Sequence, residues 1–449
     1  MAQAGALLTQ TTTSAVLPRI IPRSEHNISR ANISRNALKV LYRLKDGGYQ
    51  AFIVGGGVRD LLLNRQPKDF DIATDASPEQ VRALFSNARL IGRRFRLVHV
   101  RFRDEIVEVA TFRGLGNEDL ESEDRQILDA TGRIIKDNSF GSIEEDAWRR
   151  DFTVNALYYN IADYSIWDFV NGMQDVEARR IRLIGDPETR YREDPVRMIR
   201  AARLAAKLDL DIHPEAAAPM ARLGALIDGV PPARLFDEFL KVFETGHALA
   251  GYQRLRAHGL FEHLFPATAD WLASGAGGRP DDRRNRFIER ALANTDQRIV
   301  DGLPVTPMFL FGVLLWGPVQ ERAAVLRRAG DLSEVQSLID AGLEVTIEQI
   351  ERITLPRRFS VPMREMIQLQ PRFNRRQGRR ASVLLQHRRF RAAYDLLVLR
   401  TELGDVPLEL ADWWTRIQSL SPEEQHREFN GGRGGGRGSP RQPPAEQAV

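Results

Sequence analysis

The sequence predicts an α+β protein in which a small mixed α/β head precedes a long all-helical body. Two observations support this fold class. Between residues 31 and 170, helical patterns alternate with short strand-like stretches, whereas from about residue 187 onward almost every pattern is helical, with Pro and Gly between the helices. Strands confined to one part of a chain and helices to another are typical of α+β proteins.

Length and composition divide the chain into five expected regions. Its 449 residues exceed what one ordinary core accommodates, so we expect several domains or a long helical extension. The start is rich in Thr, Ser and Ala and the end in Gly, Arg and Pro, which favours mobile segments. The expected regions are a flexible segment at 1–30, the head at 31–170, a helical region at 171–260, a helical body at 261–425 and a disordered tail at 426–449.

The elements of the head follow from glycine, capping and alternation signals. Gly47-Gly48 ends the first helix, because glycine commonly follows a helix end. Capping boxes at Ser77 and Ser142 open two later helices. In chain order we expect a helix over Asn36 to Asp46, a strand over Ala51 to Val54, a glycine turn and short helix through Leu63, a strand over Asp69 to Ala73, a helix from Ser77, strands over Leu97 to Phe102 and Ile106 to Phe112, a flexible loop from Gly114 to Asn138, and a helix from Ser142 toward Arg149.

Helical periodicity dominates the remainder of the chain. The clearest stretches lie between Pro or Gly residues and place Pro at or near the helix start, where its missing N–H costs nothing. They are Pro195 to Leu208, Pro232 to Phe243 and Ala381 to Leu399.

Composition excludes several classes of protein. The chain has no cysteine, which excludes disulfides, thiolate zinc sites and a cysteine nucleophile, and fits a cytoplasmic protein. No apolar run approaches the ~18 to 20 residues of a transmembrane helix, and no basic segment precedes an apolar one at the start, so we expect neither a membrane segment nor a signal peptide. Only six of the 64 basic residues are lysine. Arginine binds phosphate and stacks on bases, although a GC-rich genome produces the same bias.

Two aspartates in PKDFDIATDAS indicate a metal site. On a strand, Asp69 and Asp71 face one way and Phe70 the other, with the two carboxylates roughly 6.5 Å apart. Like charges that close need a positive partner, which is either an arginine or a metal ion. Coupled to the glycine turn, the pair favours Mg²⁺, which binds a few carboxylates together with substrate phosphates. Two such ions can activate an attacking hydroxyl and stabilise leaving pyrophosphate.

A third carboxylate has two candidates. Glu108 lies on the expected strand in EIVEVATF, and Asp151 follows two arginines in RRDFTVNALYYN. Either could lie beside the pair. The structural alternative for Asp151 is a helix cap or an ion pair with Arg149 or Arg150.

Two further segments carry features that suit a nucleotide. Glycines Gly55, Gly56 and Gly57 let the backbone approach a ligand closely, and Arg59 lies one turn later, although such a turn is often only structural. In EDPVRMIRAARLAAKL, Asp194 is a good helix cap. Asp194 and Arg197 could also present an acceptor and donors in one plane, as reading a base edge requires.

The segment from Arg372 to Arg391 suits an RNA backbone. It holds eight arginines interleaved with Phe373 and Phe390, which could act as stacking rings. The alternative is a solvated helix face with core aromatics. The candidate RNA-binding residues are Arg372, Arg375, Arg376, Arg379, Arg380 and Arg388.

Taken together, these segments resemble the class II nucleotidyltransferase superfamily of the polymerase β type, which holds bacterial poly(A) polymerases and tRNA CCA-adding enzymes. The resemblance rests on GGGVRD, DFDIAT, RRDFTVNALYYN and EDPVRMIRAARLAAKL, in the order and spacing of that family. The stretch LIGRRFRLVHV and the downstream RRQGRRASVLLQHRRFRAAYDLLVLR look like the poly(A) polymerase branch, and no HD-type metal motif stands in the helical body. The Gly/Arg-rich end departs from the Lys/Arg tail that the family often carries.

The resemblance implies a template-independent enzyme that adds AMP from ATP to RNA 3′ ends, releases pyrophosphate and marks RNA for decay. It implies that Asp69 and Asp71 hold Mg²⁺, with two ions acting, and that Asp151 is the third acid. Arg150 and the glycine turn would lie near the triphosphate, and Asp194 and Arg197 would contact the incoming base. The helical region at 171–260 would recognise the nucleotide, and the helical body would bind RNA. A CCA-adding enzyme and a non-catalytic RNA-binding protein are the competing interpretations.

Overall fold

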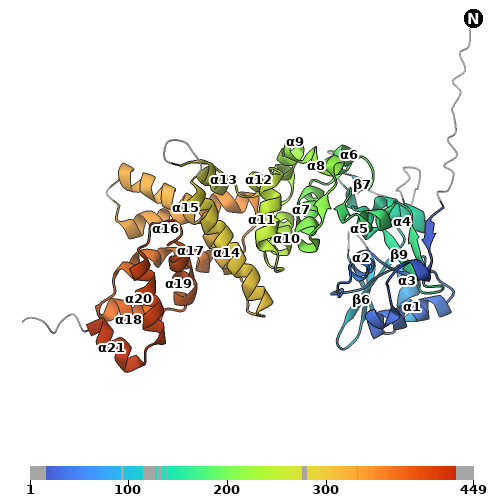
Figure 1. The fold of residues 1–449 in the computed structure, drawn as a ribbon, viewed down its shortest axis with the longest axis horizontal. Coiled ribbons are helices and arrows are strands. Elements are labelled where there is room, and N and C mark those ends of the chain that lie inside the picture. Colours follow the sequence, from blue (N-terminus) through green and yellow to red (C-terminus); the bar gives the residue numbers. More distant parts are fainter. Residues whose placement is uncertain are drawn as a thin grey trace, which may run out of the picture. The chain divides into compact units, whose positions relative to one another are not determined.

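The computed structural model describes residues 17–92, 96–114, 127–128, 134–136, 140–275, 281–330 and 332–430. The chain divides into two compact units, Met1–Leu226 and Ile227–Val449 (Figure 1). The first combines a sheet with helices, and every element described in the second is helical. The predicted α+β class is therefore confirmed. The boundary between the units lies between Leu226 and Ile227, inside the segment 171–260 that we expected to form one helical region.

An eight-stranded mixed sheet forms the centre of the first unit, in the order β1-β10-β9-β2-β3-β6-β5-β4. The pairing of β3 with β6 is parallel, and the other pairings in this sheet are antiparallel. The strands are β1 (Arg19–Ile21), β2 (Ala51–Val54), β3 (Asp71–Thr74), β4 (Ala88–Ile91), β5 (Leu97–Arg101), β6 (Ile106–Thr111), β9 (Leu157–Asn160) and β10 (Ile166–Asp168).

Strand β2 is the central strand of the head. All four of its residues are buried, as expected for a strand covered on both faces. The Phe52 ring packs 5.2 Å from Trp167 and 6.1 Å from both Phe112 and Tyr158, measured between ring centroids. This aromatic cluster fixes β2 against β3 and β9, so the glycine turn that follows Val54 has a rigid base.

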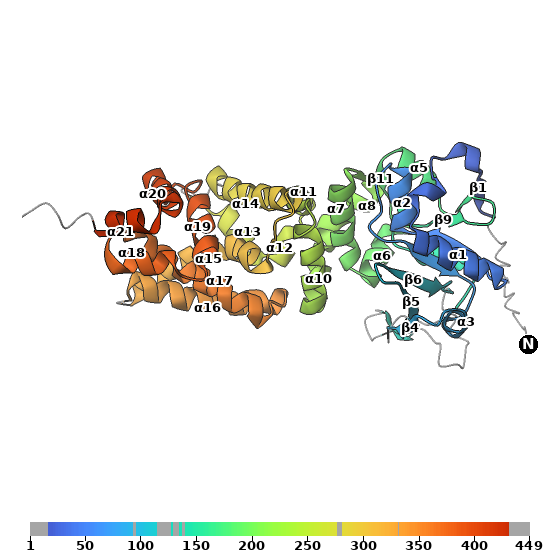
Figure 2. The same cartoon turned by 90° about the horizontal axis from the view of Figure 1, so that it is seen from below.

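Short helices cover the sheet and begin where the sequence predicts. Both capping boxes are present, at Ser77 with Gln80 and at Ser142 with Glu145. Helices α1 and α3 contact one another, and both contact β6; Figure 2 shows α3 near β4. The helices of the head are α1 (Arg35–Asp46), α2 (Gly56–Leu62), α3 (Pro78–Leu84), α4 (Ile143–Arg149) and α5 (Gly172–Glu177).

The ends of the expected head differ from the prediction. Strand β1 lies within the segment 1–30 that we expected to be flexible, and it pairs with β10. Regular structure therefore begins earlier in the chain than predicted. Three residues carry too short a pattern to predict this strand from sequence. Residues 1–16, 115–126 and 431–449 lie outside the described residues. Within the expected loop, β7 (Ile127–Leu128) and β8 (Ile134–Lys136) form a two-stranded sheet.

Four helices and a small parallel sheet complete the first unit. The helix expected from Pro195 is confirmed as α7, with Pro195 itself at the N-cap. Asp194 still supplies a cap of a different kind, since its Oδ1 accepts a hydrogen bond from the Val196 N–H at 3.3 Å. The elements are α6 (Pro187–Glu193), α7 (Val196–Leu208), α8 (Pro214–Ala217), α9 (Met220–Leu223), β11 (Arg180–Ile181) and β12 (Asp211–Ile212).

The second unit is a helical array around an aromatic core. Phe239 and Phe311 pack with ring centroids 4.4 Å apart, and Phe236, Phe243 and Phe265 join them. Its helices are α10 (Pro232–Phe243), α11 (Ala248–Ala257), α12 (Phe261–Leu264), α13 (Pro266–Ala273), α14 (Asp282–Val300), α15 (Pro307–Ala329), α16 (Glu334–Arg352), α17 (Arg357–Gln368), α18 (Gly378–Leu385), α19 (Phe390–Leu399), α20 (Leu408–Ser419) and α21 (Pro422–Asn430).

The prediction of one helix over Ala381 to Leu399 is wrong. The structure has two helices, α18 and α19, with a turn between them in which the Phe390 N–H bonds to the His387 carbonyl at 2.7 Å. The His387 ring also accepts the Arg389 N–H at 3.1 Å, which removes that donor from a continuous helix. Helix α21 likewise extends to Asn430, into the tail expected from residue 426.

Among the described helices, α15 is long and apolar enough by length and composition to cross a membrane. The sequence pattern did not suggest this. Its apolar side chains, including Leu310, Phe311 and Leu314, are buried against the other helices of the unit. A helix that is apolar on all sides is also what the core of a large helical unit contains.

Candidate active site

Gly55 opens the site at the end of β2. Its φ of 74° and ψ of −134° belong to a conformation that glycine adopts without strain. A Cβ built there would lie 3.6 Å from Arg150 Nη1 and 3.9 Å from Asp71 Oδ2. The glycine turn therefore meets a guanidinium and a carboxylate at one point.

The loop before β3 places the two aspartates. Phe70 is buried, while Asp69 and Asp71 reach the surface, which confirms that the aromatic ring and the carboxylates face opposite ways. A Cβ on Gly57 would lie 3.2 Å from Phe70 Cδ1, so glycine permits the close packing that seats this ring. The predicted strand begins later than expected: β3 starts at Asp71, and Asp69 precedes it in the loop.

Glu108 joins the two aspartates. It lies directly opposite Asp71 in the parallel pairing of β3 with β6, and its Oε1 lies 3.1 Å from His99 Nε2 on β5. The pKa of Asp71 is raised to about 6, first by burial and then by the negative charges of Glu108 and Asp69. Part of Asp71 is exposed, yet neighbouring protein atoms desolvate its carboxylate. Asp71 therefore carries the repulsion of two neighbouring carboxylates, which the positive charge of Arg150 partly offsets.

This cluster fits a hard divalent cation. Carboxylate oxygens are the ligands that Mg²⁺ prefers, and a cation would relieve the repulsion that raises the pKa of Asp71. Among the described residues, no three His, Asp or Glu side chains lie close enough together to hold a metal ion by themselves, so a cation here would need further ligands. The arrangement suits Mg²⁺ that shares its coordination with water and phosphate oxygens.

Arg150 lies beside Gly55 near Asp71, and its positive charge lowers the pKa of that carboxyl. Its Nη2 donates to Asp146 Oδ2 at 2.9 Å and its Nε to Tyr158 Oη at 3.0 Å, while Tyr158 donates to the same Asp146 oxygen at 2.6 Å. Burial acts to lower the pKa of Arg150, but Tyr158 and Asp146 raise it above its ordinary value. The guanidinium is therefore charged and held in one orientation beside Gly55.

Three further arginines near Arg150 and Asp151 are partly desolvated. Burial lowers the pKa of Arg113, Arg149 and Arg190, to about 10 for Arg149, and neighbouring guanidinium charges add to the effect. Arg190 Nη2 donates to the carbonyls of Arg149 and Arg150 at 2.9 and 2.7 Å, which ties α6 to the end of α4. These contacts fix the segment that holds Arg150.

Asp151 has different neighbours from the Asp69–Asp71 pair. Its Oδ1 accepts hydrogen bonds from the Phe152 N–H at 2.9 Å and from Asn155 Nδ2 at 3.3 Å. Its Oδ2 lies 2.6 Å from Arg200 Nη2 on α7. The structure thus ties Asp151 to an arginine of the EDPVRMIRAAR segment, whereas Glu108 is the acid that lies against Asp71.

Arg59 is bound to protein groups. Its Nε and Nη2 donate to Asp60 Oδ1 at 2.9 and 2.7 Å, and its Nη1 donates to Asn155 Oδ1 at 2.5 Å. The side chain is buried. Arg59 therefore connects the glycine turn to the Arg150–Asn155 segment.

Arg197 faces the backbone of α6. Its Nη1 donates to the Arg190 carbonyl at 2.6 Å and to Glu193 Oε2 at 2.9 Å. Arg190 donates to the same Glu193 oxygen at 2.9 Å. The helix start that holds Asp194 and Arg197 is thereby joined to the arginine cluster through Arg190.

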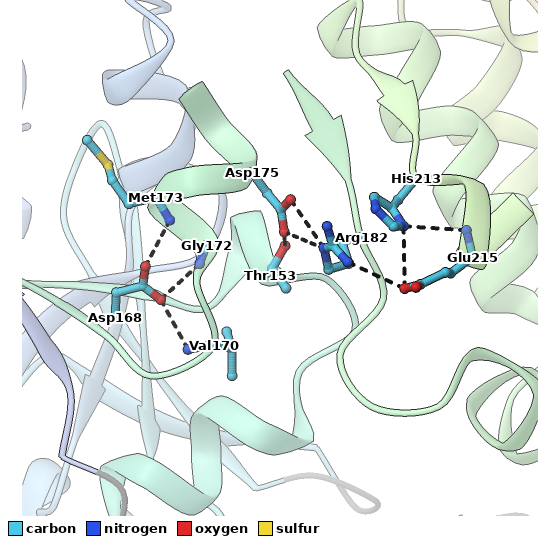
Figure 3. Close-up of polar contacts among 9 residues, drawn as sticks. All are labelled: Thr153, Asp168, Val170, Gly172, Met173, Asp175, Arg182, His213 and Glu215. Atoms are coloured by element: carbon cyan, nitrogen blue, oxygen red, sulfur yellow. Dashed lines mark hydrogen bonds and ion pairs between the residues drawn. The ribbon is translucent and has the colours of Figure 1, made fainter. Parts of the chain in front are cut away.

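A separate polar network supports the segment that follows Arg150 (Figure 3). Thr153 Oγ1 donates to Asp175 Oδ2 at 2.7 Å, and Arg182 Nε donates to the same oxygen at 3.1 Å. A Cβ on Gly172 would lie 2.3 Å from the Thr153 carbonyl oxygen, so only glycine fits there. Asp168 Oδ1 accepts the Gly172 N–H at 2.9 Å and holds the start of α5. This network fixes residues 151–155 and hence Asn155.

Sequence reasoning missed several members of the site. Asn155 and Tyr158 stand in RRDFTVNALYYN, yet nothing in their spacing distinguishes them from ordinary strand and turn residues. Arg113, Arg190 and Arg200 become part of the site only through contacts between segments distant along the chain.

The candidate RNA-binding arginines lie in the second unit, around η6 (Gln370–Asn374) and α18. All six are exposed, and Arg388 pairs with Glu365, whereas none of the other five forms an ion pair with a described residue. The expected stacking rings are absent: Phe373 and Phe390 are buried and pack on Trp414 with centroids 5.2 and 5.6 Å away. Both rings therefore belong to the core, which is the alternative that the sequence left open.

The head and its site define the class of protein. A mixed sheet that carries acidic residues beside a glycine turn, followed by helices, characterises a nucleotidyltransferase with a polymerase β-type head. Family models match the chain as "Poly A polymerase head domain" over residues 51–182, "Probable RNA and SrmB- binding site of polymerase A" over 209–272 and "Polymerase A arginine-rich C-terminus" over 330–446.

Curated relatives narrow the class. The chain is 50% identical over 415 residues to poly(A) polymerase I of Salmonella typhi, covering 92% of this chain and 88% of that protein. It is 42% identical over 410 residues to the Haemophilus influenzae enzyme, covering 91% and 90%. The CCA-adding enzyme of Bacillus subtilis is 36% identical over 228 residues, covering 51% of this chain and 55% of that protein. The chain belongs to the bacterial poly(A) polymerase I family.

Solved structures agree on the fold. The Bacillus stearothermophilus CCA-adding enzyme in complex with CTP matches with a TM-score of 0.54 at 24% identity, covering 86% of this chain and 82% of that one. A tRNA nucleotidyltransferase with a primer tRNA and an incoming ATP analog matches with a TM-score of 0.54 at 20% identity, covering 84% and 98%.

The family establishes the activity. The chain is a polynucleotide adenylyltransferase that adds AMP from ATP to RNA, and the enzymes of this family use ATP and a divalent metal. The predictions of a nucleotidyltransferase head, a helical body and poly(A) polymerase activity are confirmed. The roles of individual site residues stay predictions.

Proposed function

We propose that adenylate transfer takes place between the glycine turn and the acidic cluster. Asp69 and Asp71 would hold Mg²⁺, with Glu108 as the third carboxylate beside them. The observation that supports this most directly is geometric: the register of β3 and β6 sets Glu108 directly opposite Asp71, and Asp71 Oδ2 lies beside the glycine turn. Two Mg²⁺ ions, when bound by these residues, would lower the pKa of the RNA hydroxyl and neutralise charge on the leaving pyrophosphate.

The triphosphate of ATP would lie against Gly55, Gly56 and Gly57 beside Arg150. Gly55 leaves open the space that a side chain would occupy next to the Arg150 guanidinium. Arg150 supports an anion at this point, because Tyr158 and Asp146 hold its guanidinium charged and oriented beside Gly55. Arg59 would not contact the triphosphate itself; its hydrogen bond to Asn155 fixes the position of the glycine turn relative to the segment that holds Arg150.

Asp194 and Arg197 would contact the adenine base, at the start of α7. Arg197 is oriented by Glu193 and by the Arg190 carbonyl. Asp151 reaches the same helix through Arg200. We therefore assign Asp151 to nucleotide positioning and Glu108 to the acidic cluster, in place of the expectation that Asp151 is the third acid.

The reaction forms one bond and breaks one. The RNA 3′ oxygen attacks the α-phosphorus of ATP in line, the bond to the pyrophosphate oxygen breaks, and the hydroxyl proton passes to solvent. The side chains of this site hold reactants in place and balance charge, which supplies most of the catalysis in phosphoryl transfer. Arginines of the second unit would hold the RNA strand while adenylates are added. We place the enzyme in the cytoplasm, where its products are marked for decay.

The test is incorporation of each nucleoside triphosphate, supplied singly with Mg²⁺, onto a generic RNA 3′ end. Long ladders with ATP alone, absent in Asp69→Ala, would support the assignment. Near wild-type turnover in Asp71→Ala would refute the metal-binding role. Addition of a few residues that uses CTP on tRNA lacking its end would move the assignment to a CCA-adding enzyme.

A second pair of variants separates the two acids. Glu108→Gln should raise the Mg²⁺ concentration needed for half-maximal rate, because it removes charge from the cluster around Asp71. Asp151→Asn should raise the KM for ATP at an unchanged Mg²⁺ requirement, because it loosens Arg200. If Asp151→Asn instead raised the Mg²⁺ requirement and Glu108→Gln did not, Asp151 would be the third acid.

A further inference from the structure

The head contains a cavity of about 370 Å³ that the adenylate transfer site does not use. Tyr159 of β9 lines this cavity, whereas its neighbour Tyr158 hydrogen-bonds to Arg150. Successive side chains of a strand point to opposite faces of a sheet, so the cavity lies across the sheet from Arg150. Its lining residues are Arg23, Ser29, Arg30, Ala31, Tyr159 and Tyr164.

Two arginines give the cavity its charge. Arg23, the first residue of η1 (Arg23–Glu25), donates from Nη1 to the His26 carbonyl at 2.8 Å. Arg30, the first residue of η2 (Arg30–Asn32), donates from Nη1 to Tyr42 Oη at 3.1 Å. Both side chains are exposed, neither forms an ion pair with a described residue, and the lining includes no carboxylate. Positive charge that no neighbouring acid offsets attracts an anion.

Tyr164 supports the guanidinium of Arg30. Arg30 Cζ lies 4.6 Å from the centroid of the Tyr164 ring. The φ of Tyr164 is 65°, a conformation that is unfavourable for a bulky side chain. The turn keeps it there, because the Tyr164 carbonyl accepts a hydrogen bond from His26 Nε2 at 2.9 Å. Arg30 therefore rests on a fixed ring, and its exposed guanidinium can stack on a second planar group.

Tyr159 and Ser29 add hydroxyl groups. Tyr159 is 1% exposed, and its hydroxyl forms no hydrogen bond with a described residue. Protein atoms do not enclose that oxygen completely, so the cavity is where its partner can lie. Burial raises the pKa of Tyr159, which keeps the O–H available as a donor. Ser29 Oγ accepts the Ala31 N–H at 3.3 Å, and its own hydrogen remains free to donate.

Charge, planar groups and size together identify the ligand. Guanidinium and hydroxyl donors suit a phosphate, and a guanidinium that lies on an aromatic ring suits a nucleobase. Ligand pockets usually exceed ~300 Å³, so about 370 Å³ accommodates one nucleotide. A small inorganic anion would leave the exposed face of Arg30 unused.

We propose that this cavity is a second nucleotide site, which binds one nucleoside phosphate unit. The base stacks on Arg30, and the phosphate accepts hydrogen bonds from Arg23 and Tyr159. The unit is either one nucleotide of the RNA strand or a free nucleotide, since the two present the same groups. This site does not depend on the residues assigned to adenylate transfer.

Hydrogen exchange of the full chain locates the site. AMP at millimolar concentration, with EDTA present, should slow exchange in the turn at residues 160–165 of the wild-type protein. Arg30→Lys keeps the charge but removes the planar group, and should lose this protection. Arg35→Gln is the matched control and should retain it, because Arg35 is exposed, forms no ion pair with a described residue and does not line the cavity. Ribose 5-phosphate, which lacks the base, should protect less than AMP.

The dissociation constant of labelled oligo(A) RNA, over a range of salt concentrations, tests the strand as the source of the nucleotide. Arg30→Lys and Tyr159→Phe should each weaken binding roughly tenfold. Arg23→Gln should lower the salt slope by about 0.7, the value for one phosphate contact on a single strand. Weaker RNA binding by these variants assigns the site to the strand. Loss of AMP protection at unchanged RNA affinity assigns it to a free nucleotide.

Two controls separate the causes of a loss of binding. Tyr159→Phe should keep the wild-type melting temperature, so that unfolding does not explain its effect. Asp69→Ala should lose AMP incorporation yet retain both the protection by AMP and the affinity for RNA. The assignment of the transfer site and that of the second site can therefore fail independently.

Three results would overturn the proposal. Absence of AMP protection in the turn, together with wild-type RNA affinity in Arg30→Lys and Tyr159→Phe, would mean that the cavity binds no nucleotide. Equal changes of the salt slope in Arg23→Gln and Arg35→Gln would mean that the charge acts from a diffuse surface. Equal protection by AMP and ribose 5-phosphate would mean that no base stacks on Arg30.

Discussion

Replacing Asp71 by Asn should stabilise the metal-free protein while it abolishes polymerisation. The folded-state pKa of Asp71 is about 6, above its ordinary value of 3.8. The folded state therefore binds the proton more tightly than the unfolded state, and stability falls as pH rises between about 4 and about 6. Above that window the charged Asp71 destabilises the fold, because Glu108 and Asp69 repel it and burial desolvates it.

The expected gain is modest. A pKa difference of about two pH units corresponds to about 3 kcal/mol as an upper bound. Asp71 is partly exposed, so water screens the repulsion and we expect about 1 kcal/mol at pH 8. At pH 3.5 both proteins carry a neutral side chain at this position, and the difference should vanish.

Hydrogen exchange of β3 and β6, with EDTA present, measures this effect in the head alone, since the chain has two compact units. Mg²⁺ should then stabilise the wild-type protein by binding the folded state and reduce or reverse the advantage of Asp71→Asn. Asp75→Asn provides a contrast of opposite sign, because Asp75 Oδ1 accepts the Gln50 N–H at 2.8 Å. A variant no more stable than the wild type at pH 8, or a gain independent of pH, would refute the reasoning.

Two pairs of glycine variants test the close packing. Gly55 and Gly48 both have a positive φ, of 74° and 85°, so Gly55→Ala and Gly48→Ala should each lose about 1 to 2 kcal/mol of stability. Only Gly55→Ala should also lose most of its AMP incorporation. The Cβ of that variant would meet Arg150 and Asp71, whereas nothing lies within 4 Å of a Cβ on Gly48. Gly317→Ala should lower the melting temperature well beyond Gly312→Ala, since its Cβ would lie 2.1 Å from the Trp271 ring whereas the other meets the end of a flexible methionine; equal melting temperatures would contradict this.

The acidic pair and the glycine turn could be predicted because local spacing carries them. Alternation in DFD places two carboxylates opposite a buried ring, and Phe70 is buried as expected. Glu108 stayed one of two candidates, because its approach to Asp71 depends on the parallel pairing of β3 with β6. Sheet order is a property of the whole head, so no window of sequence around Glu108 contains it.

The role of the two aromatic residues among the arginines could not be predicted from sequence for a different reason. Phe373 and Phe390 stand among arginines, and that local sequence serves equally for a ring that stacks on a base and one that packs in a core. The structure places both against Trp414, which lies more than 20 residues further along the chain. The predicted helix over Ala381 to Leu399 failed for a related reason, since a turn held by the His387 ring has no marker such as Pro or Gly.

The strand order of the head also sets when the head can form during synthesis. Strand β2 has β3 on one side and β9 on the other, yet β9 is made about 100 residues after β2, on the order of ten seconds later on the ribosome. Until Leu157–Asn160 emerges, β2 presents an unpaired apolar edge, the kind of surface that recruits another chain. Chains that end before Leu157 should therefore aggregate, and the acidic cluster reaches its working form only once the second half of the head has been translated.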